Sequence, residues 1–143
     1  MNTYIVDASV AVKWFLEEEN QKSAIHLANE CGKNRIKIIV PEFFFVEMAN
    51  VFWSKTERNL LKIFEAMEMM DRLVKLGLKR YSDHELSEVA LENALQYGIS
   101  VYDALYVSLA EIYVAPLVTA DETLIKACKN RFDFILPLQE IKN

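Results

Sequence analysis

Short apolar runs alternate with helical patterns along the chain. Three runs rich in β-branched residues, TYIVD, IKIIV and PLVTA, predict buried strands at 3–7, 36–40 and 116–120. LKRYS at 78–82 predicts a short edge strand, and FDFILPL at 132–138 predicts the last strand. Apolar residues that recur every three or four positions predict helices at about 24–31, 42–53, 60–74, 86–97, 101–113 and 121–131.

This alternation indicates the fold class. Strands that are apolar throughout are typical of a parallel sheet covered by helices on both faces. We therefore predict one three-layer α/β domain over residues 1–143, without a linker, an internal repeat or a low-complexity segment. Pro41 suits the first position of the helix that follows, because that position needs no N–H. The helix at 101–113 is apolar on nearly every side and should be the central one.

The composition excludes several classes of site. Only three glycines occur in 143 residues, too widely spaced for a glycine-rich phosphate loop. The two cysteines have no zinc-ligand spacing and suit a reduced, cytoplasmic compartment. Asp103 and Glu111 interrupt the apolar stretch 101–118, so we expect a soluble protein without a membrane span.

Acidic residues follow the predicted strands, where a parallel sheet binds its ligands. Asp7 ends the first strand and Asp121 directly follows PLVTA, so both belong to the crevice at the carboxyl ends of the strands. Asp103 lies near the start of its helix. An ordinary role is open for each, because an aspartate before a helix caps backbone N–H groups and one in the first turn suits the helix dipole.

Glu47 has no capping role, because it lies in the apolar helix 42–53 beyond the first turn. An unpaired buried carboxylate costs several kcal/mol, so Glu47 should face a cation, a proton donor or a solvent-filled cleft. A salt bridge across the domain or to a partner is the structural alternative. Asn50 follows on the same face and either supports Glu47 by a hydrogen bond or is an ordinary helix residue.

The segments around these four acids resemble a known family. IVDASVAVKWF, PEFFFVEMANVF, GISVYDALYVSLA and LVTADETLIKA look like the four acidic motifs of PIN-domain nucleases, and most of all like those of VapC-type toxins. The likeness covers essentially the whole chain, in order and at the family's spacing. It implies a PIN-like α/β/α fold with a central parallel sheet of four or five strands. It also implies acidic residues that bind Mg²⁺ or Mn²⁺ for the cleavage of RNA.

The resemblance therefore assigns catalysis and metal binding to Asp7, Glu47, Asp103 and Asp121. Ser9 and Thr119 match positions where the family often places a hydroxyl, which can orient a water or a carboxylate. Ordinary alternatives remain, since Ser9 can satisfy nearby backbone groups and Thr119 has capping-box spacing to Glu122. All-oxygen ligands without a His or Cys cluster favour Mg²⁺ or Mn²⁺ over zinc.

The net charge bears on the RNA substrate. The chain carries 21 acidic and 16 basic side chains, a net charge of -5, which argues against a large basic surface. Without the four site carboxylates the charge is -1, and two bound divalent ions would make it positive. We expect modest, salt-sensitive RNA affinity. The candidates for phosphate contacts, each with an ordinary surface charge as its alternative, are Lys13, Lys33, Arg35, Lys37, Lys55 and Arg58.

Two phosphoryl-transfer classes fit the sequence less well than a PIN-domain nuclease, and two other PIN-domain functions remain open. A haloacid-dehalogenase-like phosphotransferase needs a second aspartate where this chain has Ser9, and a receiver domain needs an acidic pair and a later lysine that are not evident. A catalytically silent PIN-fold interaction module and a PIN ribonuclease of housekeeping RNA processing both remain open. The presence of all four acids argues against the silent module.

Two protein partners are expected. The first is a second copy of the chain, because the apolar residues exceed what one core stripe needs. These residues are Phe43, Phe44, Phe45, Phe52, Trp53, Met67, Met69 and Met70. A deeply buried helix within a monomer is the alternative. The second partner, implied by the resemblance, is an antitoxin whose tail docks around Glu47 and places an Arg or Lys among the four carboxylates.

Overall fold

The computed structural model describes residues 2–142, and a sheet of five parallel strands forms its centre. The strands lie in the order β3-β2-β1-β4-β5. Their bounds are β1 Asn2–Val6, β2 Ile36–Pro41, β3 Lys79–Tyr81, β4 Leu117–Thr119 and β5 Ile135–Pro137. The predicted α/β class and the predicted edge strand are confirmed.

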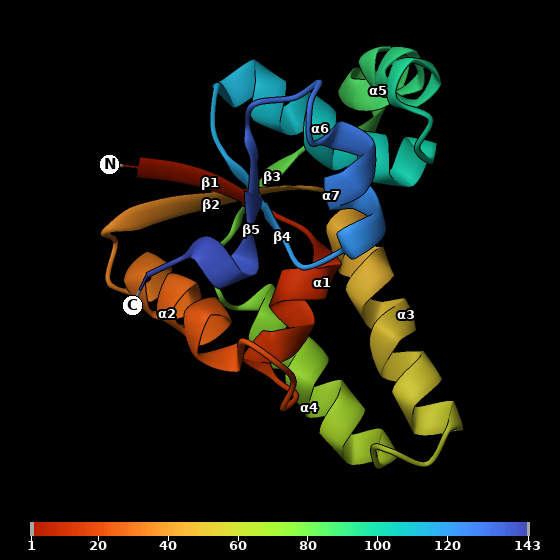
Figure 1. Cartoon of the computed structure of the whole chain (residues 1–143). Coiled ribbons are helices and arrows are strands. Elements are labelled where there is room, and N and C mark those ends of the chain that lie inside the picture. The colour runs from red at the N-terminus through yellow and green to blue at the C-terminus, as the bar shows by residue number, and fades with distance from the viewer. Residues whose placement is uncertain (1, 143) are drawn as a thin grey trace.

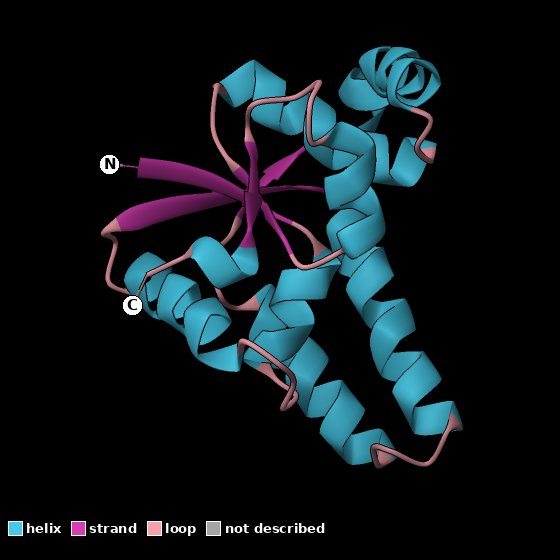
Figure 2. Cartoon of the chain, in the orientation of Figure 1, coloured by secondary structure: helices cyan, strands magenta, loops and turns pink. Residues whose placement is uncertain are grey.

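Helices cover both faces of the sheet (Figures 1 and 2). α5 and α6 lie on one side, α1, α2 and α4 on the other, and α3 and α7 toward the end where β1 finishes (Figure 1). Within residues 2–142, no helix has the length and apolar character needed to cross a membrane. The helix bounds are α1 Ala8–Ala11, η1 Val12–Trp14, α2 Gln21–Gly32, α3 Phe43–Glu57, α4 Ile63–Val74, α5 Asp83–Tyr97, α6 Val101–Tyr113, α7 Glu122–Cys128 and η2 Leu138–Glu140.

One part of the core lies between the sheet and α6, and another includes buried residues of α1, α2, α3 and α4. α6 packs on β1 and β2 and is covered by α5, and its residues from Ala104 to Ala110 are buried. Ile5 pairs in register with Ile39 on one side and with Leu117 on the other, and all three are fully buried. The helix that is apolar on nearly every side is therefore enclosed by other elements, as predicted.

Pro41 differs from the prediction, because it is the last residue of β2 and not the first of a helix. It pairs with Tyr81 of β3, and the next N–H, that of Glu42, donates to the Tyr81 carbonyl at 2.9 Å. Successive N–H groups of a strand point to opposite sides, so the missing N–H of Pro41 would face β1, whose pairing ends at Ile39. The missing N–H of Pro41 therefore removes no hydrogen bond between β1 and β2. The helix that follows, α3, begins at Phe43.

Part of the apolar surface of α4 faces solvent, although Met69 and Met70 pack against the core. Leu73 of this helix is buried, whereas Ile63, Phe64, Met67 and Val74 are 60–74% exposed. α3 and α4 form a helical hairpin that extends beyond the sheet (Figure 1). Periodicity located α4 correctly, but it does not distinguish a stripe that covers the core from one that is left free.

Candidate active site

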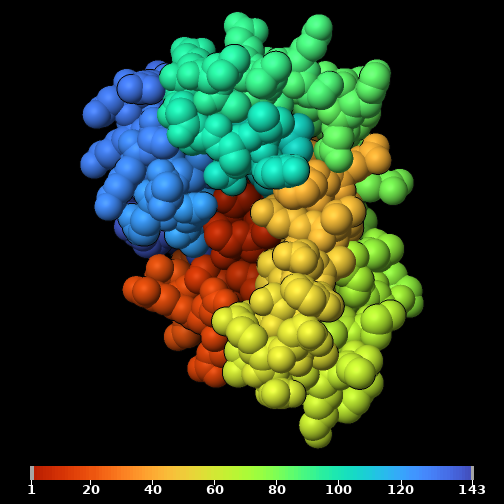
Figure 3. All heavy atoms as spheres, turned by 90° about the vertical axis from the view of Figure 1, so that its right-hand side faces the viewer, coloured from red at the N-terminus to blue at the C-terminus, as the bar shows by residue number. Residues whose placement is uncertain are grey.

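Two neighbouring strands position the first residues of the site. Asp7 directly follows β1, and Asp121 lies two residues after the end of β4 at Thr119. Because β1 and β4 are parallel neighbours, their carboxyl ends meet at one edge of the sheet. Figure 3 shows a hollow at this edge, where the red N-terminal segment lies between orange α3, the teal start of α6 and the blue chain of α7.

Two hydroxyl groups hold the carboxylate of Asp7. The Ser9 hydroxyl donates to Oδ1 and the Thr119 hydroxyl donates to Oδ2, each at 2.5 Å. The same hydroxyls accept backbone N–H groups, Ser9 from Ala120 at 2.9 Å and Thr119 from Asp121 at 3.1 Å. These N–H bonds leave the hydroxyl protons free to point at Asp7. Asp7 occupies the N-cap position of α1, but both of its carboxylate oxygens are held by the hydroxyls of Ser9 and Thr119.

Burial changes the acidity of Asp7. The residue is 7% exposed, and the loss of hydration raises its pKa from 3.8 to about 7. The hydrogen bonds from Ser9 and Thr119 lower the pKa and the negative charge of Glu47 raises it, but burial has the largest effect. Without a bound cation, Asp7 is therefore about half protonated near neutral pH.

Tyr106, which the sequence motifs do not single out, holds Glu47. The hydroxyl of Tyr106, a buried residue of α6, donates to Glu47 Oε1 at 2.6 Å. Burial raises the pKa of Tyr106 well above its ordinary value and the charge of Glu47 raises it further, so Tyr106 keeps its proton. A tyrosine within an apolar helix was a usable signal, because a buried hydroxyl needs a partner.

The acidity of Glu47 reflects its neighbours. Burial raises its pKa, the hydrogen bond from Tyr106 lowers it, and the charges of Asp103 and Asp121 raise it. Asn50 is exposed, and no hydrogen bond joins it to Glu47 among the residues that the structure describes. The support expected from Asn50 therefore comes from Tyr106.

Asp103 and Asp121 differ in how they relate to their helices. Ser100 caps α6 by accepting the N–H of Asp103 at 3.1 Å, so the Asp103 carboxylate is not the cap. Asp121 does cap α7, because its Oδ1 accepts two backbone N–H groups, at 2.9 and 3.2 Å. This cap takes the place of the capping box expected at Thr119. Asp121 is both a helix cap and a member of the acidic group.

The four carboxylates influence one another electrostatically. Burial raises the pKa of Asp103 and the charge of Asp121 raises it further, while Glu47 acts on Asp7. None of the ion pairs found among residues 2–142 includes any of the four. The structure thus brings together the acids singled out from the sequence, and this concentration of negative charge attracts a cation.

The ligand atoms suit a hard divalent cation, since every candidate is an oxygen. In the described part of the chain, no three His, Cys, Asp or Glu side chains form a ready cage for one ion. Mg²⁺ does not require such a cage, because it keeps several waters and is commonly bound through one or two carboxylates and substrate phosphates. The residues present therefore fit Mg²⁺ or Mn²⁺ held partly through water.

Lys13, one of the basic residues expected to contact RNA phosphates, is buried and not at the surface. The Lys13 Nζ lies 3.2 Å from Glu18 Oε1, so it is not available to bind phosphate. Arg35 pairs with Glu30 at 3.2 Å but stays largely exposed. A lysine within an apolar stretch can pack its methylene groups against neighbouring apolar side chains. A count of charges does not show that such a lysine is buried.

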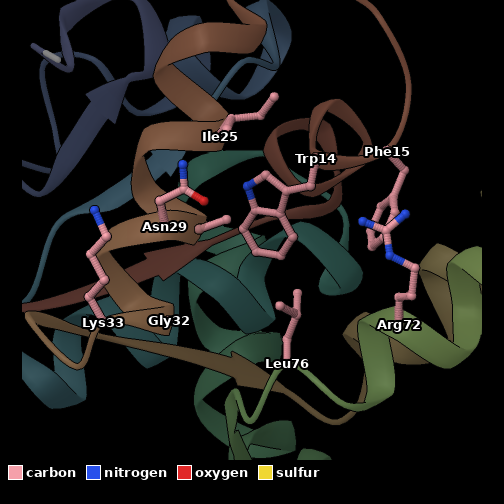
Figure 4. A pocket seen from close by; sticks show the side chains of 9 residues that line it. Trp14, Phe15, Ile25, Asn29, Gly32, Lys33, Arg72 and Leu76 are labelled. Atoms are coloured by element: carbon pink, nitrogen blue, oxygen red, sulfur yellow. The ribbon is translucent and has the colours of Figure 1, made fainter.

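A second hollow lies between α2 and α4 (Figure 4). Its volume is about 570 Å³, and Trp14, Ile25 and Leu76 are among the residues that line it. The Arg72 guanidinium at its rim lies 5.6 Å from the ring centre of Phe15. No carboxylate is among the lining residues, so this cavity is separate from the acidic site.

Solved structures from several organisms share the fold. PAE2754 from Pyrobaculum aerophilum has a TM-score of 0.72 at 22% identity, covering 96% of this chain and 85% of its own. A toxin-antitoxin complex from Klebsiella pneumoniae has a TM-score of 0.64 at 12% identity, covering 94% and 97%. VapBC2 from Rickettsia felis, bound to a DNA fragment from its promoter, has a TM-score of 0.67 at 17% identity, covering 94% and 98%. Identities this low establish the fold alone.

Sequence comparison is more specific. Ribonuclease VapC3 of Pyrobaculum aerophilum is 32% identical over 122 residues, which cover 84% of this chain and 90% of that protein. The PIN domain family matches residues 4–130. The family match includes all four acidic segments, and both matches span most of the sequence, so the chain belongs to the PIN-domain family.

Proposed function

We propose that this protein is a Mg²⁺- or Mn²⁺-dependent endoribonuclease and the toxin of a toxin-antitoxin pair. The observation that carries the proposal is buried Asp7, which is held by Ser9 and Thr119 and lies near the charge of Glu47, which in turn is influenced by Asp103 and Asp121. The ribonuclease relative supports the substrate class, and the toxin-antitoxin complexes of the same fold support the biological role. The free cysteines support a cytoplasmic location.

The side chains divide the work between binding the cation and fixing its ligands. Asp7, Glu47, Asp103 and Asp121 would hold the ion, which supplies an activated water and stabilises the leaving oxygen when bound. Ser9 and Thr119 hold both oxygens of Asp7, and Tyr106 holds one oxygen of Glu47. Ligands fixed in this way need little rearrangement during the reaction.

Metal-activated cleavage of RNA by the purified chain tests the proposal. A labelled single-stranded RNA should be cut at internal positions in Mg²⁺ or Mn²⁺, and EDTA should stop the reaction. Failure to cut a varied set of RNAs in either metal would favour the silent interaction module. Growth arrest on expression in cells separates a toxin from a housekeeping ribonuclease.

The exposed apolar surface of α3 and α4 supports an antitoxin partner. Val46, beside Glu47 on α3, and Ile63 and Val74 on α4 are 60–74% exposed. Such a surface accepts an amphipathic segment laid along the helices. A guanidinium or ammonium on that segment can pair with carboxylates of the acidic site, because Asp7, Glu47 and their neighbours have no basic partner among the ion pairs described.

Co-expression with the product of the adjacent small reading frame should yield a complex with suppressed RNA cleavage. We expect suppression of about tenfold or more, the effect of one charge-assisted contact. Replacement of the antitoxin's tail Arg or Lys by Gln should restore cleavage while the complex persists. Size-exclusion chromatography and cleavage assays at equal toxin concentration measure both. A complex that cleaves at the rate of the free enzyme would contradict this mechanism.

The same helices support a homodimer, although with less surface than the sequence suggests. Phe44 and Phe52 belong to the core, whereas Trp53 and Met67 are exposed. We expect light scattering at micromolar concentration to report twice the chain mass of 16.6 kDa. Trp53→Glu should shift the protein toward the monomer, because it places a charge in the apolar contact. A wild-type mass of 16.6 kDa would exclude the dimer.

A further inference from the structure

A pair of aromatic rings stands on the two helices that carry Glu47 and Asp103. The rings of Phe43 and Tyr102 are stacked, with their centres 4.9 Å apart and their planes 23° from parallel. Phe43 is half-buried and packs against the core, whereas Tyr102 is 62% exposed. Tyr102 is therefore supported on one side by Phe43 and open to solvent over much of its surface.

This pair lies one helical turn from the acidic site. Phe43 precedes Glu47 by four residues on α3, and Tyr102 precedes Tyr106 by four residues on α6, so each helix presents both of its residues on one face. Two successive contacts join the helices, the hydrogen bond from Tyr106 to Glu47 and the stacking of Tyr102 on Phe43. Four helical residues rise about 6 Å, a distance that one nucleotide can bridge.

Both rings lie in the first turns of helices, and side-chain hydrogen bonds hold these turns in place. The Asp83 carboxylate accepts the N–H of Phe43 at 3.1 Å, and the Ser100 hydroxyl accepts the N–H of Asp103, the residue after Tyr102, at 3.1 Å. A surface that is ordered before binding loses little conformational entropy when a ligand arrives. The flat ring of Tyr102 is therefore preformed beside the acids.

We propose that Tyr102, supported by Phe43, is a stacking platform for an unpaired RNA base next to the scissile phosphate. The inference rests on the proposed ribonuclease function and adds a base-binding side chain beside its acidic site. Unpaired bases are bound by stacking on exposed aromatic rings, whereas bases inside a duplex are not accessible to them. With a net charge of -5, phosphate contacts alone bind RNA weakly, so a stacked base supplies part of the affinity.

Substitutions at Tyr102 test the platform through KM and kcat for a labelled single-stranded RNA of mixed sequence. Tyr102→Ala should raise KM about 5- to 100-fold, the effect of losing one base–aromatic stack, and change kcat less. Tyr102→Phe and Tyr102→Trp should retain the wild-type KM, because the ring and not the hydroxyl binds the base. Leu95→Ala removes a side chain of α5 that is 77% exposed and should change neither constant. Thermal unfolding checks that each variant is folded.

An RNA with one abasic nucleotide beside the cleavage site identifies the stacked base. Wild type should cleave this RNA with the raised KM that Tyr102→Ala shows on intact RNA, and Tyr102→Ala should not distinguish the two RNAs. Equal KM values for wild type and Tyr102→Ala, or a loss in Tyr102→Phe as large as in Tyr102→Ala, would overturn the platform and leave the ribonuclease intact. Failure of wild type to cleave any RNA would instead refute the proposed function and this inference with it.

Discussion

Replacement of Asp7 by asparagine is expected to lower RNA cleavage by more than about 100-fold, the upper range for residues that only support a metal ligand. The fold should persist, because the amide occupies the same space between Ser9 and Thr119. Cleavage rates in saturating Mg²⁺ measure the loss. Adding Asp103→Asn to Asp7→Asn should cost little more, because both residues would serve the one metal centre that we propose.

The same substitution should stabilise the metal-free protein at alkaline pH. The pKa of Asp7 is about 7 in the folded protein and 3.8 in its ordinary state. Between these values the folded state keeps a proton that the unfolded state has lost, so stability falls as pH rises from 3.8 to about 7. Asparagine stays neutral at every pH. The free energy of unfolding of Asp7→Asn should therefore equal that of wild type near pH 3.8 and exceed it most above pH 7, by on the order of 1 to 4 kcal/mol.

Denaturant unfolding in EDTA, at an acidic and an alkaline pH, measures this difference. Asp133→Asn is the matched control, because Asp133 is exposed and should affect neither stability nor cleavage. An Asp7→Asn variant that cleaves RNA near the wild-type rate would remove Asp7 from the site. If Asp7→Asn is less stable than wild type above pH 7, the ionised carboxylate of Asp7 does not destabilise the metal-free protein, and this explanation is wrong.

The Mn²⁺ concentration needed for half-maximal cleavage should rise steeply as the pH falls below neutral. In the proposed site a cation would bind the ionised form of Asp7, so protons would compete with it for the same carboxylate. Because the pKa of Asp7 is about 7, each unit of pH below that value should raise the Mn²⁺ concentration for half-maximal cleavage about tenfold. Above the pKa the required concentration should change little.

Mn²⁺ titrations of cleavage and of Mn²⁺ binding by electron paramagnetic resonance measure this dependence. Saturating Mn²⁺ should restore much of the rate lost below pH 7, which distinguishes proton competition from acid unfolding. The binding measurement does not depend on turnover and should show the same trend. A half-saturating concentration that stays constant across the range would exclude Asp7 as the titrating ligand.

Much of the fold follows from local patterns. The strands and helices were recognisable because a strand buried on both faces is continuously apolar and a helix repeats every three to four residues. The parallel sheet then places Asp7 and Asp121 at one edge, because both follow strands. The local sequence does not predict Pro41 in a strand. A strand accepts a proline there because β1 pairs with β2 only as far as Ile39, and that limit is set by the sheet.

The sequence by itself determined the α/β class, the sheet elements and the acids that gather at the strand ends. The tertiary structure alone decided which side chains hold those acids, since Ser9 and Thr119 are 110 residues apart and Tyr106 is 59 residues from Glu47. It also decided which apolar residues of α4 are exposed and which pack against the core. Periodicity reports which residues share a face of one element, whereas contacts between elements depend on how the elements pack.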